Sequence, residues 1–197
     1  MYKKQMVFQK IVCFIAVLAA AVSFAYSLGI MTDIYDGLFF FMPYPDKPEF
    51  DAVPGARIFY DMQPFNSDYV IYSIGLILAG CLLFITNTHS RRKYYISNFI
   101  ASIVYSVASI GVAIWVHIQV SAFKTQFLTT VDFETYKMRA EMMKTPYIES
   151  TFWFDAHYFV CGLIILAVVA VIVNLGMKIA LMNNEKKLLG QSKEATV

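Results

Sequence analysis

Four stretches of the chain contain no Asp, Glu, Lys or Arg, and all four are strongly apolar. They are residues 11–32, 69–90, 94–123 and 156–177. The shortest has 22 residues, and at about 1.5 Å per residue a helix of that size is about 33 Å long. This length crosses a hydrocarbon core of about 30 Å. The pattern therefore predicts four transmembrane segments.

These runs predict helices rather than the strands of a membrane barrel, because they are unbroken and show no alternation of apolar and polar positions. A cleavable signal peptide is the alternative for the first run, but that run is longer than a typical signal core, and we expect it to remain a helix. We expect an all-α membrane protein, a single domain of residues 1–197 with four transmembrane helices in an up-down-up-down bundle. The expected spans are residues 9–31, 69–89, 94–122 and 154–178, with two sizeable outer loops, 32–68 and 123–153, and a cytoplasmic tail, 179–197.

The composition and the placement of charge agree with lipid crossings. Hydrophobic residues make up 58% of the 197 and charged residues 15%, against roughly a quarter charged in soluble proteins. Ten of the 16 Lys and Arg residues lie in or beside the two tails and in the turn at residues 91–93. By the positive-inside rule, both termini and this turn are expected in the cytoplasm. The small size and the lack of cysteine in the outer loops favour the cytoplasmic membrane of a bacterium.

The sequence carries none of the motifs on which the common enzyme classes depend. No GxSxG, HExxH, P-loop or dinucleotide fingerprint is present, and no CxxC pair is available for thiol exchange. The basic residues are few and lie where topology signals lie, so nucleic-acid binding is not expected. We therefore expect no enzymatic activity and no cofactor.

Small residues along the spans predict where the helices approach one another, because in lipid close contact depends on them. The first three spans each carry such a stripe, so we expect these spans to pack tightly. The fourth, rich in Val, Ile and Leu, is expected to be the more exposed to lipid. The stripes are Ala21, Ala25 and Gly29, then Gly75 and Ala79, then Ser102, Ser106, Ser109 and Ala113.

The first outer loop contains five of the six prolines and nine aromatic residues. That is enough apolar surface to repay the entropy of ordering, so the loop is not a disordered linker. Pro54-Gly55 suits a tight turn, and residues 56–61 have some extended character. Two interpretations stay open for the loop: a buried cap over the end of the bundle, or a docking surface for another membrane protein.

The second outer loop has a helical pattern at residues 132–144. Its apolar positions fall on one face, Thr130 or Asp132 can cap its start, and Pro146 follows its end. We expect an amphipathic helix outside the membrane, with its apolar face on lipid, on the first loop or on a partner chain.

By exclusion, the sequence predicts a small integral membrane protein that acts by association, as an accessory or scaffolding subunit of a larger membrane complex. The alternative is an oligomeric protein that lets a small solute or ion permeate. Membrane lipid and another membrane protein are the expected partners, and a homo-oligomer is left open. The expected contact residues are Phe39, Phe40, Phe41, Tyr44, Phe59, Tyr60, Phe133, Tyr136 and Met143.

A third hypothesis concerns His117, Asp155 and His157, which the topology brings to a similar depth near the outer ends of the last two spans. Neutral imidazoles and a carboxylate can hold a metal ion or pass a proton. Asp155 and His157 are only two positions apart, however, and point in different directions on a helix. Interfacial His and Asp beside Trp115, Trp153 and Tyr158 more often serve only as helix-end anchors.

Overall fold

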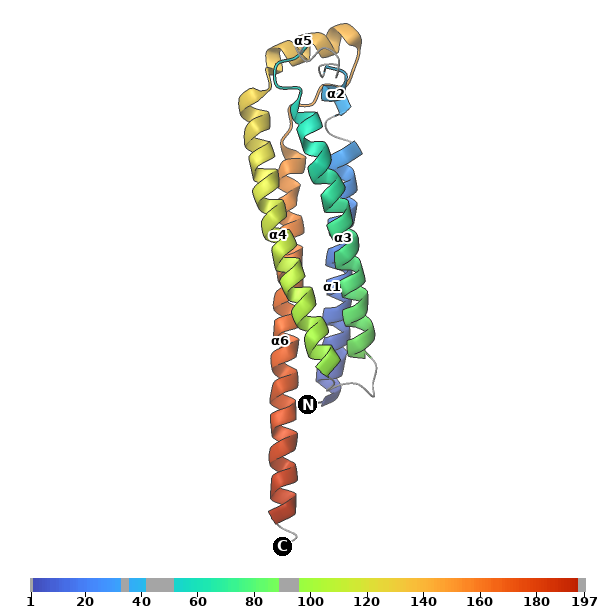
Figure 1. Cartoon of the computed structure of the whole chain (residues 1–197), viewed down its shortest axis with the longest axis vertical. Helices are drawn as coiled ribbons and strands as arrows, with labels where there is room; N and C mark the ends of the chain where they lie inside the picture. Colours follow the sequence, from blue (N-terminus) through green and yellow to red (C-terminus); the bar gives the residue numbers. More distant parts are fainter. Residues whose placement is uncertain (1, 33–35, 42–51, 89–95, 195–197) are drawn as a thin grey trace. The chain divides into compact units, whose positions relative to one another are not determined.

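The computed structural model of the chain describes residues 2–32, 36–41, 52–88 and 96–194. The secondary structure that it describes is helical throughout (Figure 1). The turn at residues 91–93 lies outside the described residues, as does Tyr44. The helices are α1 (Tyr2–Thr32), α2 (Asp36–Phe39), α3 (Ile58–Thr88), α4 (Ile96–Thr130), α5 (Phe133–Met143) and α6 (Phe152–Glu194).

Within the described part of the chain, four helices are long and apolar enough to cross a membrane: α1, α3, α4 and α6. This supports a multi-pass membrane protein. α1 and α6 contain the predicted spans 9–31 and 154–178, and α3 and α4 cover the predicted spans 69–89 and 94–122 as far as the structure describes them. The helices also continue beyond those spans. α3 begins at Ile58, inside the expected first loop, and α6 runs on to Glu194 through most of the expected tail.

The chain divides into two compact units, to each of which all four long helices contribute a segment. Unit 1 comprises Met1–Ala21, Gly75–Gly111 and Leu163–Val197, and unit 2 comprises Val22–Ile74 and Val112–Gly162. In each unit the four segments pack together as a helical bundle.

The core of unit 1 is formed by buried side chains from all four long helices. Tyr105 crosses this core, and its hydroxyl donates a hydrogen bond of 3.0 Å to the carbonyl of Ala16. Val17 packs against Gly80, where an added Cβ would meet the Val17 side chain at 3.4 Å. The members of the core are Val12, Cys13, Ala16, Leu83, Ala101, Tyr105, Val168 and Val171.

The small-residue prediction is confirmed for α4 and wrong for α1. Ser102, Ser106, Ser109 and Ala113 are buried, whereas Ala21 and Ala25 are exposed. The buried row of α1 is instead Ala16, Ala20, Ser23 and Ser27. Both rows of α1 consist of small residues at helical spacing and point in different directions, so the spacing alone does not choose between them.

The prediction that the fourth span is the more lipid-exposed is also wrong. The apolar window of α3 is 28% buried, the lowest of the four, against 39% for that of α6. Gly75 of α3 makes no close approach, because an added Cβ there would meet no atom within 4 Å. The Val, Ile and Leu residues of α6 include several that are fully buried, such as Ile164, Val168 and Val171.

The predicted turn at Pro54-Gly55 is present in unit 2. The Ala56 amide donates to the carbonyl of Val53 at 3.1 Å, and Gly55 has a φ of +83°, the value that the third residue of a type II turn requires. A side chain at Gly55 would also collide with the backbone of Thr130. The turn is tied to the start of α5 because the Asp132 amide donates to the carbonyl of Pro54 at 3.0 Å.

The expectation of extended character at residues 56–61 is wrong, because α3 begins at Ile58. The Ile58 and Phe59 amides each donate to the carbonyl three positions earlier, which starts the helix directly after the turn. The apolar residues Ile58, Met62 and Phe65 are all buried, and their spacing of three and four is helical.

The helix predicted in the second loop is confirmed as α5, at the same end of unit 2 as α2 (Figure 1). Asp132 is its N-cap and accepts a hydrogen bond from the Thr135 amide at 3.1 Å; Lys144 ends the helix in the left-handed conformation with a φ of 54°. Tyr136 and Ala140 are buried, and the Tyr136 hydroxyl donates to the Pro146 carbonyl at 3.2 Å.

Candidate functional site

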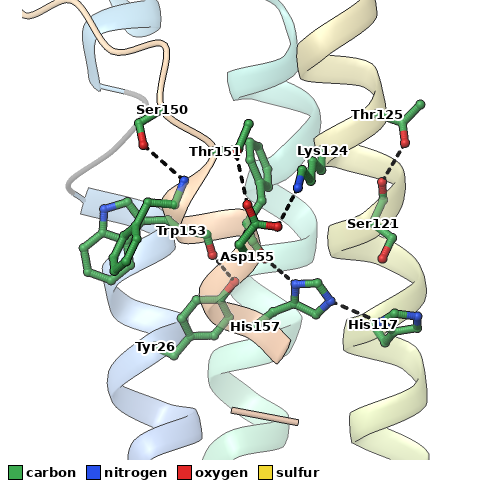
Figure 2. Close-up of polar contacts among 12 residues, drawn as sticks. Tyr26, His117, Ser121, Lys124, Thr125, Ser150, Thr151, Trp153, Asp155 and His157 are labelled. Carbon is green, nitrogen blue, oxygen red and sulfur yellow. Dashed lines mark hydrogen bonds and ion pairs between the residues drawn. The ribbon is translucent and has the colours of Figure 1, made fainter. Parts of the chain in front are cut away.

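Two of the three predicted metal or proton residues meet in unit 2. His117 of α4 and His157 of α6 face one another, with His117 Nδ1 and His157 Nε2 3.1 Å apart (Figure 2). The centroids of the two rings are 5.3 Å apart. His157 is fully buried, while His117 is exposed. The pair therefore joins one side chain within the bundle to one at its surface.

The hydrogen-bond partners of His157 determine which ring nitrogens of the two histidines carry a hydrogen. His157 Nδ1 lies against the carbonyl of Phe154, one turn earlier in α6. A carbonyl only accepts, so Nδ1 of His157 carries the hydrogen, and the neutral ring offers a lone pair at Nε2. His117 then donates from its Nδ1 to this lone pair. The Phe154 carbonyl thus orients His157 so that its free nitrogen points at α4.

Asp155 does not join the two histidines. Its carboxylate accepts from Lys124 Nζ at 2.5 Å and from the Thr151 hydroxyl at 3.0 Å (Figure 2). Lys124 lies on α4, so this ion pair, like the histidine pair, connects α4 to α6. Within residues 2–32, 36–41, 52–88 and 96–194, no group of three or more His, Cys, Asp or Glu side chains is placed to hold a metal ion.

Other polar groups in the spans of unit 2 bond across helices. The Tyr26 hydroxyl of α1 donates to the Trp153 carbonyl at the start of α6, at 2.9 Å. Ser23 of α1 bonds to the Tyr69 hydroxyl at 2.9 Å and to the Ser73 hydroxyl at 3.3 Å, both on α3. These groups join α1 to α3 and to α6, a structural role that needs no ligand.

The predicted contact residues divide into exposed and buried sets. Phe39, Phe40, Tyr60 and Met143 are each more than half exposed, at 54–63%. Phe41, Phe59 and Tyr136 are buried and do not form the surface of unit 2, and Phe133 is half-buried. Tyr44 lies outside the described residues. The described part of the first loop is therefore in part a packed cap and in part an exposed aromatic surface.

Two exposed residues of α5 were not among the predicted contacts. Met138 and Met142 are 59% and 69% exposed. They lie four positions apart and so form one stripe, on the side of α5 opposite the buried Tyr136 and Ala140. Helical spacing in the sequence would have identified this stripe, because Met138 and Met142 lie on the face of the helix opposite Tyr136 and Ala140.

The tyrosine and aspartate groups around α5 are perturbed by their neighbours. Hydrogen bonds from the Thr135 side chain and backbone hold the pKa of Asp132 below its usual range. Burial raises the pKa of Tyr147 to about 12, and its hydrogen bond to Glu149 adds to the effect. Burial also raises the pKa of Tyr136. At neutral pH the Asp132 cap is therefore ionised and both tyrosines carry their hydrogens.

Sequence reasoning missed a buried polar group in unit 1. Lys178, counted above as a cytoplasmic topology signal, is 1% exposed and donates a hydrogen bond to the side chain of Asn87 in the last turn of α3. The amide of Gln5 donates to Gln9 at 3.1 Å and to Asn174 at 3.0 Å. The pairs Gln5/Gln9 and Asn174/Lys178 are each spaced by four, a signal of a polar helix face that the sequence does contain.

Comparison of the chain with protein-family models, with curated proteins and with solved structures finds no match.

Proposed function

We propose that this multi-pass membrane protein acts by association with another membrane protein, as an accessory or scaffolding subunit. The observation that carries the proposal is the exposed methionine stripe of α5, Met138 and Met142, on a helix that lies outside the four candidate spans. Large apolar side chains exposed away from lipid-crossing segments are typical of interaction surfaces. Methionine is adaptable in shape and is common at such surfaces.

The arrangement of α5 supports a contact surface rather than a mobile segment. The helix is capped at both ends and anchored by Tyr136 and Ala140. Arg139 and Glu141, both exposed, border the methionine stripe on its two sides. An apolar centre with a charged rim is the usual composition of a protein interface. Phe39, Phe40 and Tyr60 in the same unit add exposed aromatic surface.

The proposal includes a topology. With the positive-inside rule, both termini lie in the cytoplasm, the chain passes up and down four times, and α5 and the first loop lie on the outer side of a bacterial cytoplasmic membrane. The partner surface is then the outer part of another membrane protein, and membrane lipid covers the exposed apolar residues of the spans. The proposal gives the chain no catalytic step.

Site-specific photo-crosslinking in the native membrane tests the association. A photoreactive residue at Met142 should give one crosslinked product containing a second, different polypeptide. Met138→Glu in the same chain should abolish that product, because a buried unpaired carboxylate at the interface is costly. The control places the photoreactive residue at Lys187 of α6, which is exposed but carries no such surface, and should give no such product.

The crosslinked product and a conduction assay in liposomes together test the permeation alternative. A product at Met142 that contains only a second copy of this chain contradicts the accessory-subunit proposal. If the purified homo-oligomer also conducts a small ion or solute in liposomes, permeation replaces association as the proposed function.

A further inference from the structure

We propose that His117 and His157 form a binding site for one divalent transition-metal ion of the zinc and copper type, which links α4 to α6. The inference is independent of the proposed association and rests on unit 2 alone. Its starting point is the approach of two ring nitrogens from different helices, His117 Nδ1 and His157 Nε2, to 3.1 Å.

The separation of the nitrogens fits two ligands of one ion. Zinc–imidazole bonds are about 2.0–2.1 Å long, so at a tetrahedral angle two nitrogen ligands lie about 3.3 Å apart. The observed 3.1 Å is close to that distance. A metal ion would therefore enter between the rings once the hydrogen of neutral His117 moves from Nδ1 to Nε2, which frees the Nδ1 lone pair. The exposed ring of His117 would move slightly outward, and the buried His157 would keep its place.

The second nitrogen of His157 is held as it is in metal sites. Metal-binding histidines usually donate their other N–H to a carbonyl or carboxylate, which sets the tautomer and the direction of the ring. In His157 that partner is the carbonyl of Phe154, in the preceding turn of the same helix. The lone pair of Nε2 is thus already directed toward His117 before any ion is present.

The charges around the pair do not oppose a cation. The ammonium of Lys124, on the same helix as His117, is bonded to Asp155 at 2.5 Å, so the two charges offset one another. Tyr158, whose ring centroid lies 4.0 Å from that of His157, covers the pair with an aromatic face. Since the described chain supplies no third His, Cys, Asp or Glu ligand, water at the exposed side of His117 would complete the coordination.

The ligand set also predicts which ions bind. Imidazole nitrogens suit zinc and copper ions, whereas Mg²⁺ and Ca²⁺ prefer oxygen ligands. The full-length protein, purified in detergent with a tag that contains no histidine, should bind one Zn²⁺ in a calorimetric titration and should not respond to Mg²⁺ at the same concentration.

The chain offers a matched control, because it has three histidines and the third is His89. His117→Ala and His157→Ala should each weaken Zn²⁺ binding at least about tenfold, because loss of a partner that only orients a ligand already costs that much. His89→Ala should leave the affinity unchanged. With Cu²⁺ as the probe, pulsed electron paramagnetic resonance should detect two coordinated imidazoles in the unaltered chain and one in His117→Ala.

Because His157 is buried, its replacement can disturb folding. The Zn²⁺ affinity of the variant at the exposed His117 is therefore the decisive measurement. Equal Zn²⁺ affinity in His117→Ala and in the unaltered chain overturns the proposal, as does loss of binding in His89→Ala. A Cu²⁺ spectrum with fewer than two coordinated imidazoles in the unaltered chain overturns it as well. The remaining interpretation would then be a hydrogen-bonded histidine pair that only joins the two helices.

Discussion

At the scale of single residues, several polar groups inside the long apolar helices are paired across helices. Lys178 bonds to Asn87, Gln5 to Asn174, and His157 to His117. Polar and ionisable groups in membrane spans are expensive unless they find such partners. Lys178 gains further from its position at the last turn of α3, where the carbonyl end of the helix is partially negative.

The pairing of Lys178 predicts an asymmetry between two substitutions. Asn87→Leu leaves a buried ammonium without its acceptor and should lower the free energy of unfolding by about 2 kcal/mol, the magnitude of a hydrogen bond to a charged group. Lys178→Met removes the charge itself and should cost less, because replacing a buried charge by an apolar group of similar size is often tolerated. Unfolding in detergent by denaturant measures both.

The double variant provides the internal check. Asn87→Leu combined with Lys178→Met should be more stable than Asn87→Leu alone, since no unpaired charge remains. Asn183→Leu, at an exposed position of α6, is the control and should leave stability within about 0.5 kcal/mol of the original. Additive losses in the double variant would show that the two side chains do not interact.

At the scale of elements, α5 shows how a short helix is specified locally and placed by packing. The sequence marks both of its ends: Asp132 supplies the N-terminal cap, and Pro146 follows the last turn. A helix of 11 residues is marginal in isolation. Tyr136 and Ala140 supply the packing that keeps it folded.

The cap of α5 predicts a dependence on pH. The bonds from Thr135 favour the ionised form of Asp132, so the pKa of this group is lower in the folded chain than in the unfolded one. The cap therefore stabilises the helix fully above about pH 4, the ordinary pKa of Asp. Its contribution is lost as the pH falls through the lowered pKa. Amide protection factors of Thr135 and Tyr136 should fall together in that range.

Asp132→Asn separates this effect from general acid unfolding. Asparagine also caps helices but does not titrate in this range. The variant should keep α5 at neutral pH and lose the drop in protection on acidification. If the same drop persists in Asp132→Asn, a different carboxylate, such as the exposed Glu134, controls the helix.

At the scale of the whole molecule, the four apolar helices make the chain a multi-pass membrane protein, while the sides on which its ends lie follow only from the distribution of Lys and Arg. Labelling of single cysteines with a membrane-impermeant reagent tests that topology. Cysteine in place of Lys4 or Lys187 should react only after the inner side is opened, and cysteine in place of Met142 should react in intact cells.

The labelling is done in a variant in which the three native cysteines are replaced. Of these, Cys13 and Cys161 are buried and Cys81 is exposed. Reaction of Lys4 and Lys187 positions on opposite sides would contradict an even number of crossings. Reaction of Met142 only from the inner side would reverse the orientation and place the proposed contact surface in the cytoplasm.

The amino-acid sequence by itself determined how many helices are long and apolar enough to cross a membrane, that α5 exists and where it begins and ends, and that the chain turns at Pro54-Gly55. Each of these depends on local chemistry: the length of an uncharged run, a capping side chain, and the positive φ that Gly55 adopts. The sequence also identified His117, Asp155 and His157 as candidates at a similar depth. It did not show that the two histidines would contact one another while Asp155 bonded to Lys124.

Only the tertiary structure decided which faces of the helices pack. In lipid, the core-facing and lipid-facing sides of a helix are both apolar, so the pattern that orients helices in soluble proteins carries little information. The row at Ala16 and Ala20 is buried while Ala21 and Ala25 are not, and Lys178 is inside although it is charged. Contacts between helices far apart in sequence determine which of these rows is buried. The same kind of contact places His117 against His157 and pairs Lys124 with Asp155.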